Sequence, residues 1–136
     1  MSVKTPAGRL ATAFGDVDRM AEFYAPGVRW VLPASLPFPR PVEGKEAVIA
    51  LHRQIWSEVY RPDVEVKILD EVGDETASAV RFFYRAFALY VGRYYENEYT
   101  MFVRSGPEGV TEVFEAFDTT TTFDFYRGEP TKWKGL

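Results

Sequence analysis

The spacing of apolar residues predicts three helices and one short strand in the first 60 residues. The first helix covers 5–15, beginning at a capping threonine followed by proline and ending at a glycine. A second, shorter helix covers 16–24, and a strand covers 28–32. The segment 33–44 holds four of the nine prolines and is expected to be an extended loop. The third helix covers 44–60 and carries its apolar residues in one continuous arc.

From residue 62 onward the alternation of apolar and polar residues changes to a period of two, which is typical of strands. Strands are predicted over 64–69, 76–91, 95–104 and from 110 to about 123, the last of them ending in a run of threonines. Early helices followed by a strand meander predict an α+β fold, with helices packed on one face of an antiparallel sheet. We expect one domain over 1–136, with 124–136 as a tail.

Composition excludes several classes of protein. The net charge is −4 and no lysine or arginine cluster is longer than two residues, so nucleic-acid binding is not expected. There is no cysteine, which removes disulfides, thiolate metal sites and cysteine nucleophiles. No long apolar run or basic leader is present, so we expect no membrane segment and a cytoplasmic location. The aromatic fraction is 16%, which suits either a dense core or a pocket for a flat apolar ligand.

Known catalytic motifs are missing from the sequence. It has no glycine-rich phosphate loop, no HExxH and no GxSxG, and its single histidine makes a zinc site improbable. We therefore expect no metal and no cofactor. What remains is acid/base chemistry by side chains alone, or binding without chemistry.

Three polar positions interrupt otherwise apolar faces. His52 falls inside the arc of the third helix, which fits a pocket residue or a core histidine bonded to a backbone carbonyl. Asn97 shares a strand face with tyrosines, and it fits either a pocket residue or a side chain that hydrogen-bonds to the backbone of a strand or loop. The last strand has Phe114 and Asp118 on one face and Glu115 on the other, so the residues alone leave open which carboxylate points inward.

Three segments carry a resemblance to a known family: GDVDRMAEFYAPGVRWVLP, EGKEAVIAL and YYENEYTMFVRSGPEGVTEVFEAFDT. They resemble SnoaL-like members of the NTF2-like superfamily over nearly the whole chain to about residue 123. The resemblance implies an NTF2-like cone, in which three N-terminal helices wrap a curved, mostly antiparallel sheet around an apolar pocket, and it implies a homodimer. The superfamily includes ketosteroid isomerase, limonene-epoxide hydrolase, polyketide cyclases and non-catalytic transport factors, so this fold does not fix a function.

The resemblance also assigns expected roles to residues. Leu32 stands where the isomerase has its carboxylate base, and its oxyanion acid falls at or near Met101, so ketosteroid-type isomerisation is not expected. On the last strand the resemblance favours the face of Asp118, which with His52 forms the expected catalytic pair. The expected substrate-binding residues around the pocket are Trp30, Leu32, Phe82, Tyr84, Asn97, Tyr99, Met101 and Phe114.

Three functions fit these expectations. The first is a cofactor-independent cyclase, isomerase, dehydratase or hydrolase acting on a small hydrophobic, aromatic or polyketide-like molecule. The second is a non-catalytic carrier or sensor that uses the same pocket. The third is a protein-interaction module, with Phe83, Phe87 and Phe102 on the outer face of the sheet, although homodimerisation accounts for these side chains equally well.

Overall fold

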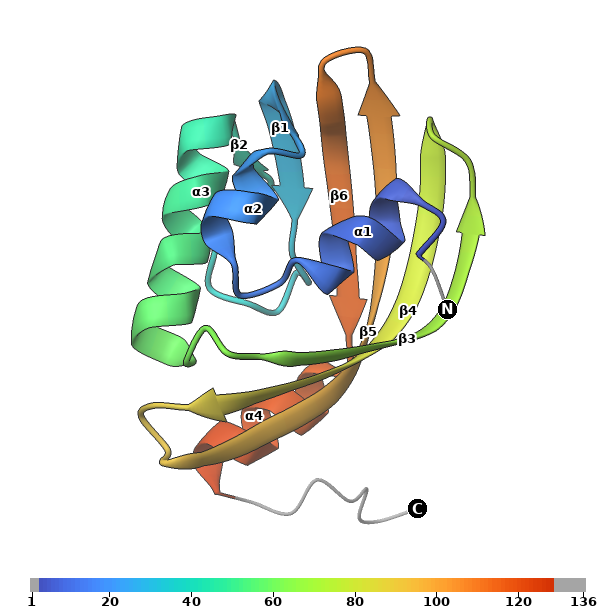
Figure 1. Cartoon of the computed structure of the whole chain (residues 1–136). Coiled ribbons are helices and arrows are strands. Elements are labelled where there is room, and N and C mark those ends of the chain that lie inside the picture. Colours follow the sequence, from blue (N-terminus) through green and yellow to red (C-terminus); the bar gives the residue numbers. More distant parts are fainter. Residues whose placement is uncertain (1–2, 129–136) are drawn as a thin grey trace.

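The computed structural model describes residues 3–128. It contains four α-helices, one π-helical turn and six strands (Figure 1). In chain order these are α1 (Pro6–Thr12), α2 (Val17–Ala21), β1 (Tyr24–Val31), β2 (Val42–Glu43), α3 (Lys45–Gln54), η1 (Ile55–Val59), β3 (Glu65–Gly73), β4 (Ala77–Ala88), β5 (Arg93–Gly106), β6 (Gly109–Phe117) and α4 (Thr119–Arg127).

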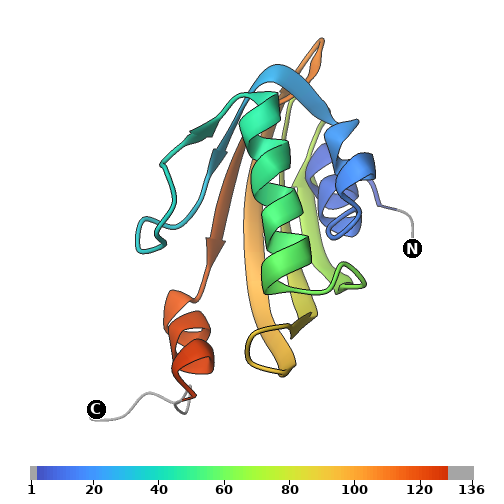
Figure 2. The same ribbon diagram turned by 90° about the vertical axis from the view of Figure 1, so that its left-hand side faces the viewer.

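The six strands form one curved, open sheet in the order β2-β1-β6-β5-β4-β3. Every neighbouring pair is antiparallel except β1 and β6, which are parallel. Helices α1 to α3 lie on the concave side, and α4 lies where the long strands β4 and β5 bend away (Figures 1 and 2). The predicted α+β cone with a curved, mostly antiparallel sheet and three N-terminal helices is confirmed.

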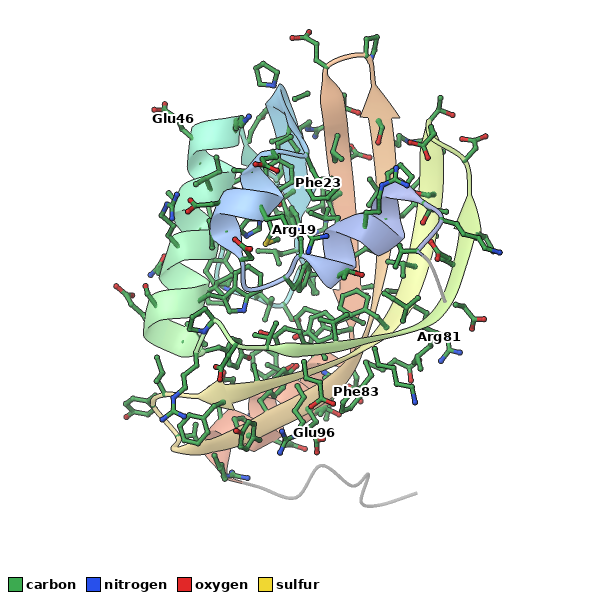
Figure 3. The ribbon with its side chains drawn as sticks, viewed as in Figure 1. Arg19, Phe23, Glu46, Arg81, Phe83 and Glu96 are labelled. Carbon is green, nitrogen blue, oxygen red and sulfur yellow. The ribbon has the colours of Figure 1, made fainter. Side chains whose placement is uncertain are left out.

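Alternation along β4 separates the two faces of the sheet. Val80, Phe82 and Tyr84 are buried beneath the helices. On the outer face, Arg81 forms ion pairs with Asp70 and Glu98, at 2.6 and 2.8 Å. Figure 3 shows Arg81, Phe83 and Glu96 directed away from the concave side. A sheet with one buried and one solvated face is what the period-two pattern predicts.

The prediction of a last strand reaching residue 123 is wrong. The strand β6 ends at Phe117, and Asp118 caps a helix by accepting hydrogen bonds from the backbone N–H groups of Thr120 and Thr121, at 3.0 and 3.3 Å. A run of threonines favours a strand, but the capping aspartate in front of this run starts a helix. Of the predicted tail, 124–127 belong to α4, while 129–136 lie outside the described residues, so the assignment of that part stays a prediction.

No helix within residues 3–128 is long and apolar enough to cross a membrane.

Candidate functional site

A cavity of about 340 Å³ lies between α3 and the concave face of the sheet, near the lower end of the range for ligand pockets. The loop after β1 and helix α4 complete its wall. Its lining is mostly aliphatic and aromatic, and none of the described lining residues is a lysine or arginine. The lining residues are Phe14, Trp30, Leu32, Leu36, Pro37, Phe38, Leu51, His52, Ile55, Trp56, Val59, Tyr60, Tyr84, Tyr99, Glu115, Phe117, Thr122, Phe123 and Tyr126.

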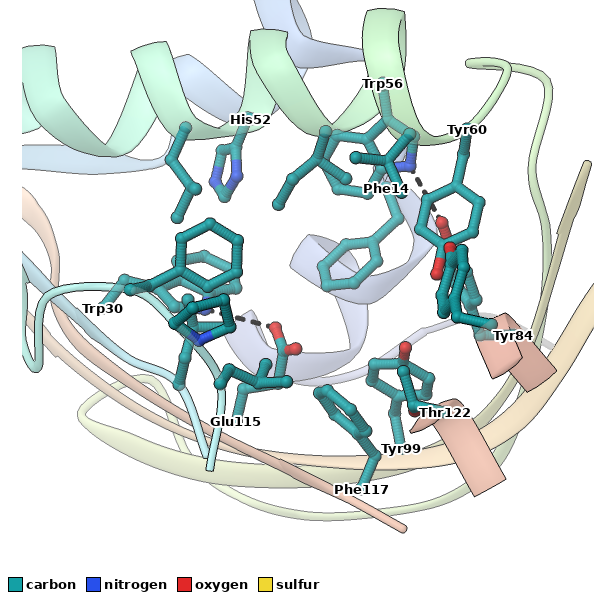
Figure 4. A pocket seen from close by; sticks show the side chains of 18 of the residues that line it. Phe14, Trp30, His52, Trp56, Tyr60, Tyr84, Tyr99, Glu115, Phe117 and Thr122 are labelled. Atoms are coloured by element: carbon teal, nitrogen blue, oxygen red, sulfur yellow. Dashed lines mark hydrogen bonds between the residues drawn. The ribbon is translucent and has the colours of Figure 1, made fainter. Parts of the chain in front are cut away.

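Glu115 is the carboxylate of this cavity. It projects inward from β6, because it lies two residues after the buried Val113 and therefore on the same face of the strand, and only 8% of it is exposed. The indole Nε1–H of Trp30, from the neighbouring strand β1, donates to Glu115 Oε1 at 3.2 Å. Residues 3–128 offer no hydrogen-bond partner to the second carboxylate oxygen, and Figure 4 shows the carboxylate facing the cavity.

Burial sets the proton affinity of Glu115. Removal from water raises the pKa of Glu115 to about 7, and the hydrogen bond from Trp30 offsets only part of this effect. Both the carboxylate and the carboxylic acid are therefore populated near neutral pH. A group of this kind can accept a proton from a bound molecule and return it, which is the requirement for general acid/base catalysis.

His52 enters the same cavity from α3, on the opposite wall (Figure 4). Its Nε2 is 2.7 Å from the Tyr24 hydroxyl, and its ring meets the Trp30 ring edge-on with 4.7 Å between centroids. Burial lowers the pKa of His52 to about 3, so the imidazole is neutral under ordinary conditions.

The partner of His52 indicates which nitrogen carries the proton. The buried Tyr24 hydroxyl has no other acceptor among the residues that the structure describes, so donation from Tyr24 to Nε2 leaves the fewest unpaired groups. Nδ1 then carries the hydrogen, and it has no partner in the described part of the chain. His52 on one wall of the cavity therefore keeps a donor, and Glu115 across from it keeps an acceptor, that no residue in 3–128 uses.

A hydrogen-bonded cluster fixes α4 against the sheet next to the cavity. The hydroxyl of Tyr95 is 3.0 Å from that of Tyr99 and 2.8 Å from Oγ1 of Thr122. Asn97 Nδ2 donates to the Tyr95 hydroxyl at 2.8 Å and to the backbone carbonyl of Asp118 at 3.0 Å. These contacts hold Thr122 in position on the cavity wall.

The family model of the SnoaL-like domain matches residues 9–105, which is more than half of the chain. The chain belongs to the SnoaL-like family. A search of the curated proteins found no match.

Solved structures share the fold of this SnoaL-like chain at low sequence identity. An NTF2-like protein of unknown function from Burkholderia pseudomallei is 19% identical, with a TM-score of 0.72, over 87% of this chain and 92% of the other. A protein with a ketosteroid isomerase-like fold from Catenulispora acidiphila, in complex with trimethylamine, is 13% identical, with a TM-score of 0.71, over 92% and 93%. The expected NTF2-like fold is thereby confirmed, and at these identities the likeness shows the fold alone.

Five of the ten expected site residues of the SnoaL-like chain line the cavity: Trp30, Leu32, His52, Tyr84 and Tyr99. Phe82 and Met101 are fully buried in the core and are not among the lining residues. Asn97 is half-buried and belongs to the cluster that holds α4.

Two expected positions on the last strand are wrong. Phe114 is 44% exposed on the outer face of β6, and Asp118 is exposed beyond the strand, where it caps α4. Because side chains alternate along a strand, an inward Glu115 forces Phe114 outward. Asp118 lies beyond the end of β6, so the alternation of side chains along the strand does not determine which way its side chain points.

Glu115 and Trp56 are cavity residues that the expected set does not contain. The sequence signal for Glu115 is its place two residues from both Val113 and Phe117, on the apolar face of the strand opposite to the one that the resemblance favours. Trp56 lay within the apolar arc of the third predicted helix. The α4 residues of the cavity, such as Thr122, were hidden by the prediction of a strand there.

Proposed function

We propose that this protein is a cofactor-independent acid/base enzyme acting on a small hydrophobic molecule of aromatic or polyketide-like character, as a cyclase, isomerase, dehydratase or hydrolase. The observation that carries the proposal is Glu115, a buried carboxyl at an apolar cavity, whose pKa is raised to about 7 and whose second oxygen has no hydrogen-bond partner within residues 3–128. A buried acid tuned to neutral pH is typical of catalytic groups.

The step we propose is proton transfer at carbon. The carboxylate of Glu115 takes a proton from a carbon next to a carbonyl, and the carbonyl oxygen gains the electron pair as an enolate. The Glu115 acid then returns the proton to the same carbon or to another atom of the conjugated system. Trp30 keeps the carboxylate in place, and the neutral His52 supplies a hydrogen-bonding group rather than a base.

The lining favours uncharged substrates. Among the described residues no cation faces the cavity, and His52 is neutral, so a carboxylate or phosphate on the ligand would be buried without a counter-ion. The many apolar side chains instead favour a ring system that is removed from water on binding.

The experiment is exchange of carbon-bound protons for solvent deuterium, followed by NMR. Acetophenone and methyl naphthyl ketone are suitable probes, because their acidic protons adjoin the carbonyl. We expect the wild type to accelerate exchange and Glu115→Gln to lose about 10²–10⁴-fold of that acceleration. Asp118→Asn is the matched control, since this exposed carboxylate lies outside the cavity, and it should leave the exchange rate unchanged. Equal rates in wild type and Glu115→Gln would contradict the proposal.

A second candidate is a non-catalytic small-molecule carrier. The observation favouring it is the nearly uniform apolar lining, which needs no chemistry to retain a ligand. The Catenulispora acidiphila protein of similar fold, solved with trimethylamine, supports ligand binding in this architecture. Probes that bind the wild type and Glu115→Gln equally, with no deuterium exchange in either, would favour the carrier.

The homodimer stays a prediction. The outer face of the sheet exposes Phe102 and Phe114, by 40% and 44%, and a second copy of the chain could cover them. The interaction-module alternative would use the same face. Light scattering after gel filtration distinguishes them: a dimer that Phe102→Ser and Phe114→Ser convert to a monomer supports self-association.

A further inference from the structure

The end of α3 is wound as a π-helical turn, η1, and this turn determines what faces the cavity. The backbone N–H of Tyr60 donates to the carbonyl of Ile55, five residues earlier, at 2.8 Å, and Trp56 departs from helical dihedral angles with φ −96° and ψ 24°. A π turn holds more residues than an α turn, so it rotates the following side chains to a new face, and such turns are common at functional sites.

Backbone hydrogen bonds join the end of the turn and the residues that follow it to the end of β4 and the residue after that strand. The N–H of Leu89 donates to the carbonyl of Val59 at 2.9 Å, and the N–H of Arg61 donates to the carbonyl of Phe87 at 3.0 Å. The π turn is thereby fixed to the same strand that carries Tyr84. Trp56 lies on η1 and Tyr84 lies on β4, and these backbone hydrogen bonds fix the two elements relative to each other.

Trp56 and Tyr84 form a hydrogen bond of known direction. Nε1 of Trp56 is 2.9 Å from the Tyr84 hydroxyl, and an indole N–H can only donate, so the Tyr84 oxygen accepts. The hydroxyl hydrogen of Tyr84 must point elsewhere, and no acceptor for it is found in residues 3–128. Both residues are buried, at 6% and 2% exposure, and both line the cavity.

A buried hydroxyl donor without an acceptor is costly. Burial also raises the pKa of Tyr84 well above its usual value, so this hydroxyl keeps its proton and remains a donor at all ordinary pH values. The acceptor that would remove the cost is an oxygen on a molecule in the cavity.

We propose that Tyr84 binds an oxygen atom of the ligand, with Trp56 as its positioning residue, and that the ligand is an uncharged hydrophobic molecule carrying a carbonyl oxygen. Figure 4 shows the Trp56–Tyr84 bond and the Trp30–Glu115 bond on opposite sides of the cavity. The ligand oxygen lies at Tyr84 and its reacting carbon lies towards Glu115. The position of that carbon rests on the proposed function, whereas the donor role of Tyr84 does not.

The test is difference infrared spectroscopy of bound acetophenone and methyl naphthyl ketone with isotope-labelled carbonyls. A donated hydrogen bond weakens the carbonyl bond and lowers its stretching frequency. We expect a lowered band in the wild type and loss of most of this shift in Tyr84→Phe, which keeps the ring but not the hydroxyl. Affinity for the ketones should fall about 2- to 12-fold in Tyr84→Phe, the effect of one net neutral hydrogen bond, with affinity for ethylbenzene and ethylnaphthalene unchanged.

Trp56→Phe tests the positioning role. Removing the indole N–H should leave a smaller and broader shift, because the hydroxyl is then free to rotate. A purely structural role for Trp56 would change stability without moving the carbonyl band.

Other outcomes separate this proposal from the acid/base function. Glu115→Gln should retain the lowered band, and a lowered band without deuterium exchange would reject the proposed function but keep the role of Tyr84. Exchange with an unshifted band, or a shift that Tyr99→Phe abolishes and Tyr84→Phe does not, overturns the role of Tyr84. Failure of both ketones to bind up to their solubility limits overturns it as well.

Discussion

Glu115 is one carboxyl group on which both the stability and the proposed chemistry depend, and Glu115→Gln separates the two. Burial raises the pKa of Glu115 from 4.5 to about 7, so the folded protein holds this proton more tightly than the unfolded chain does. Below about pH 4.5 both states are protonated and there is no penalty. As the pH rises towards 7 the unfolded chain releases the proton first, and the free energy of unfolding falls. Above about pH 7 the full penalty is present, about 3 kcal/mol.

Glutamine in place of Glu115 keeps the size of the side chain and an oxygen that can accept from Trp30, but it never ionises. We expect Glu115→Gln to match the wild type at about pH 4 and to be more stable by about 3 kcal/mol at about pH 8. The assay is urea unfolding of both proteins at a series of pH values. His52 is present in both, so its own titration cancels in the difference.

Glu112→Gln is the matched control, since Glu112 lies on the same strand but is directed towards Arg29 on the partly exposed outer face. Its stability difference from the wild type should be small, because a partly exposed ion pair contributes little to the free energy of unfolding. A Glu115→Gln difference that is flat between about pH 4 and 8 would refute the reasoning, because it would mean that the carboxyl is as well solvated in the folded protein as in the unfolded chain.

Three further predictions concern other residues. The pKa of His52 is lowered from 6.5 to about 3, so the free energy of unfolding should decrease as the pH falls below 6.5, by about 2 kcal/mol at about pH 5. Urea unfolding at a series of pH values should show this loss in the wild type and not in His52→Gln. Asp118→Ala should destabilise the protein by about 1 kcal/mol in urea unfolding by removing the cap of α4; an unchanged midpoint would contradict the capping role. Gly15→Ala should lower the melting temperature more than Gly44→Ala, because both glycines have positive φ but a Cβ only at Gly15 would overlap the carbonyl oxygen of Pro62. Equal effects would contradict this last prediction.

The N-terminal helices could be predicted because local signals agreed with the fold. The capping threonine and proline at 5–6 start α1, with Gly8 N–H donating to the threonine hydroxyl at 3.0 Å. Helical periodicity turned His52 towards the interior but left open whether it was a core or a pocket residue, and the family resemblance favoured the pocket wall, where the structure has it. Its hydrogen bond to Tyr24 was out of reach, because it joins residues that are 28 positions apart in the sequence and belong to different elements.

The inward face of β6 could not be decided from local pattern. Each face carries a large aromatic residue and an acid: Phe114 and Asp118 on one, Phe117 and Glu115 on the other. A tertiary contact decides between the two faces. The parallel pairing with β1 sets Val113 beside Trp30 and brings Glu115 within hydrogen-bond distance of the indole N–H. The end of the strand at Phe117 was readable in principle, because aspartate before a threonine run is a capping signal as much as a strand signal.

Polar side chains next to the cavity have their hydrogen bonds made by neighbouring residues, whereas some polar side chains of the cavity lining keep a hydrogen-bonding group that no residue in 3–128 uses, and this difference argues for a ligand. Beside the cavity, Asn97 makes several hydrogen bonds to its neighbours and holds α4. In the cavity lining itself, Glu115, His52 and Tyr84 each keep one hydrogen-bonding function unused by residues 3–128. Apolar residues of similar size at these three positions would remove the cost of burial, about 3 kcal/mol for Glu115 alone above pH 7. Selection for stability alone does not explain three partly unpaired polar side chains around one apolar cavity. A bound molecule with a carbonyl oxygen and an acidic carbon would use their free hydrogen-bonding groups.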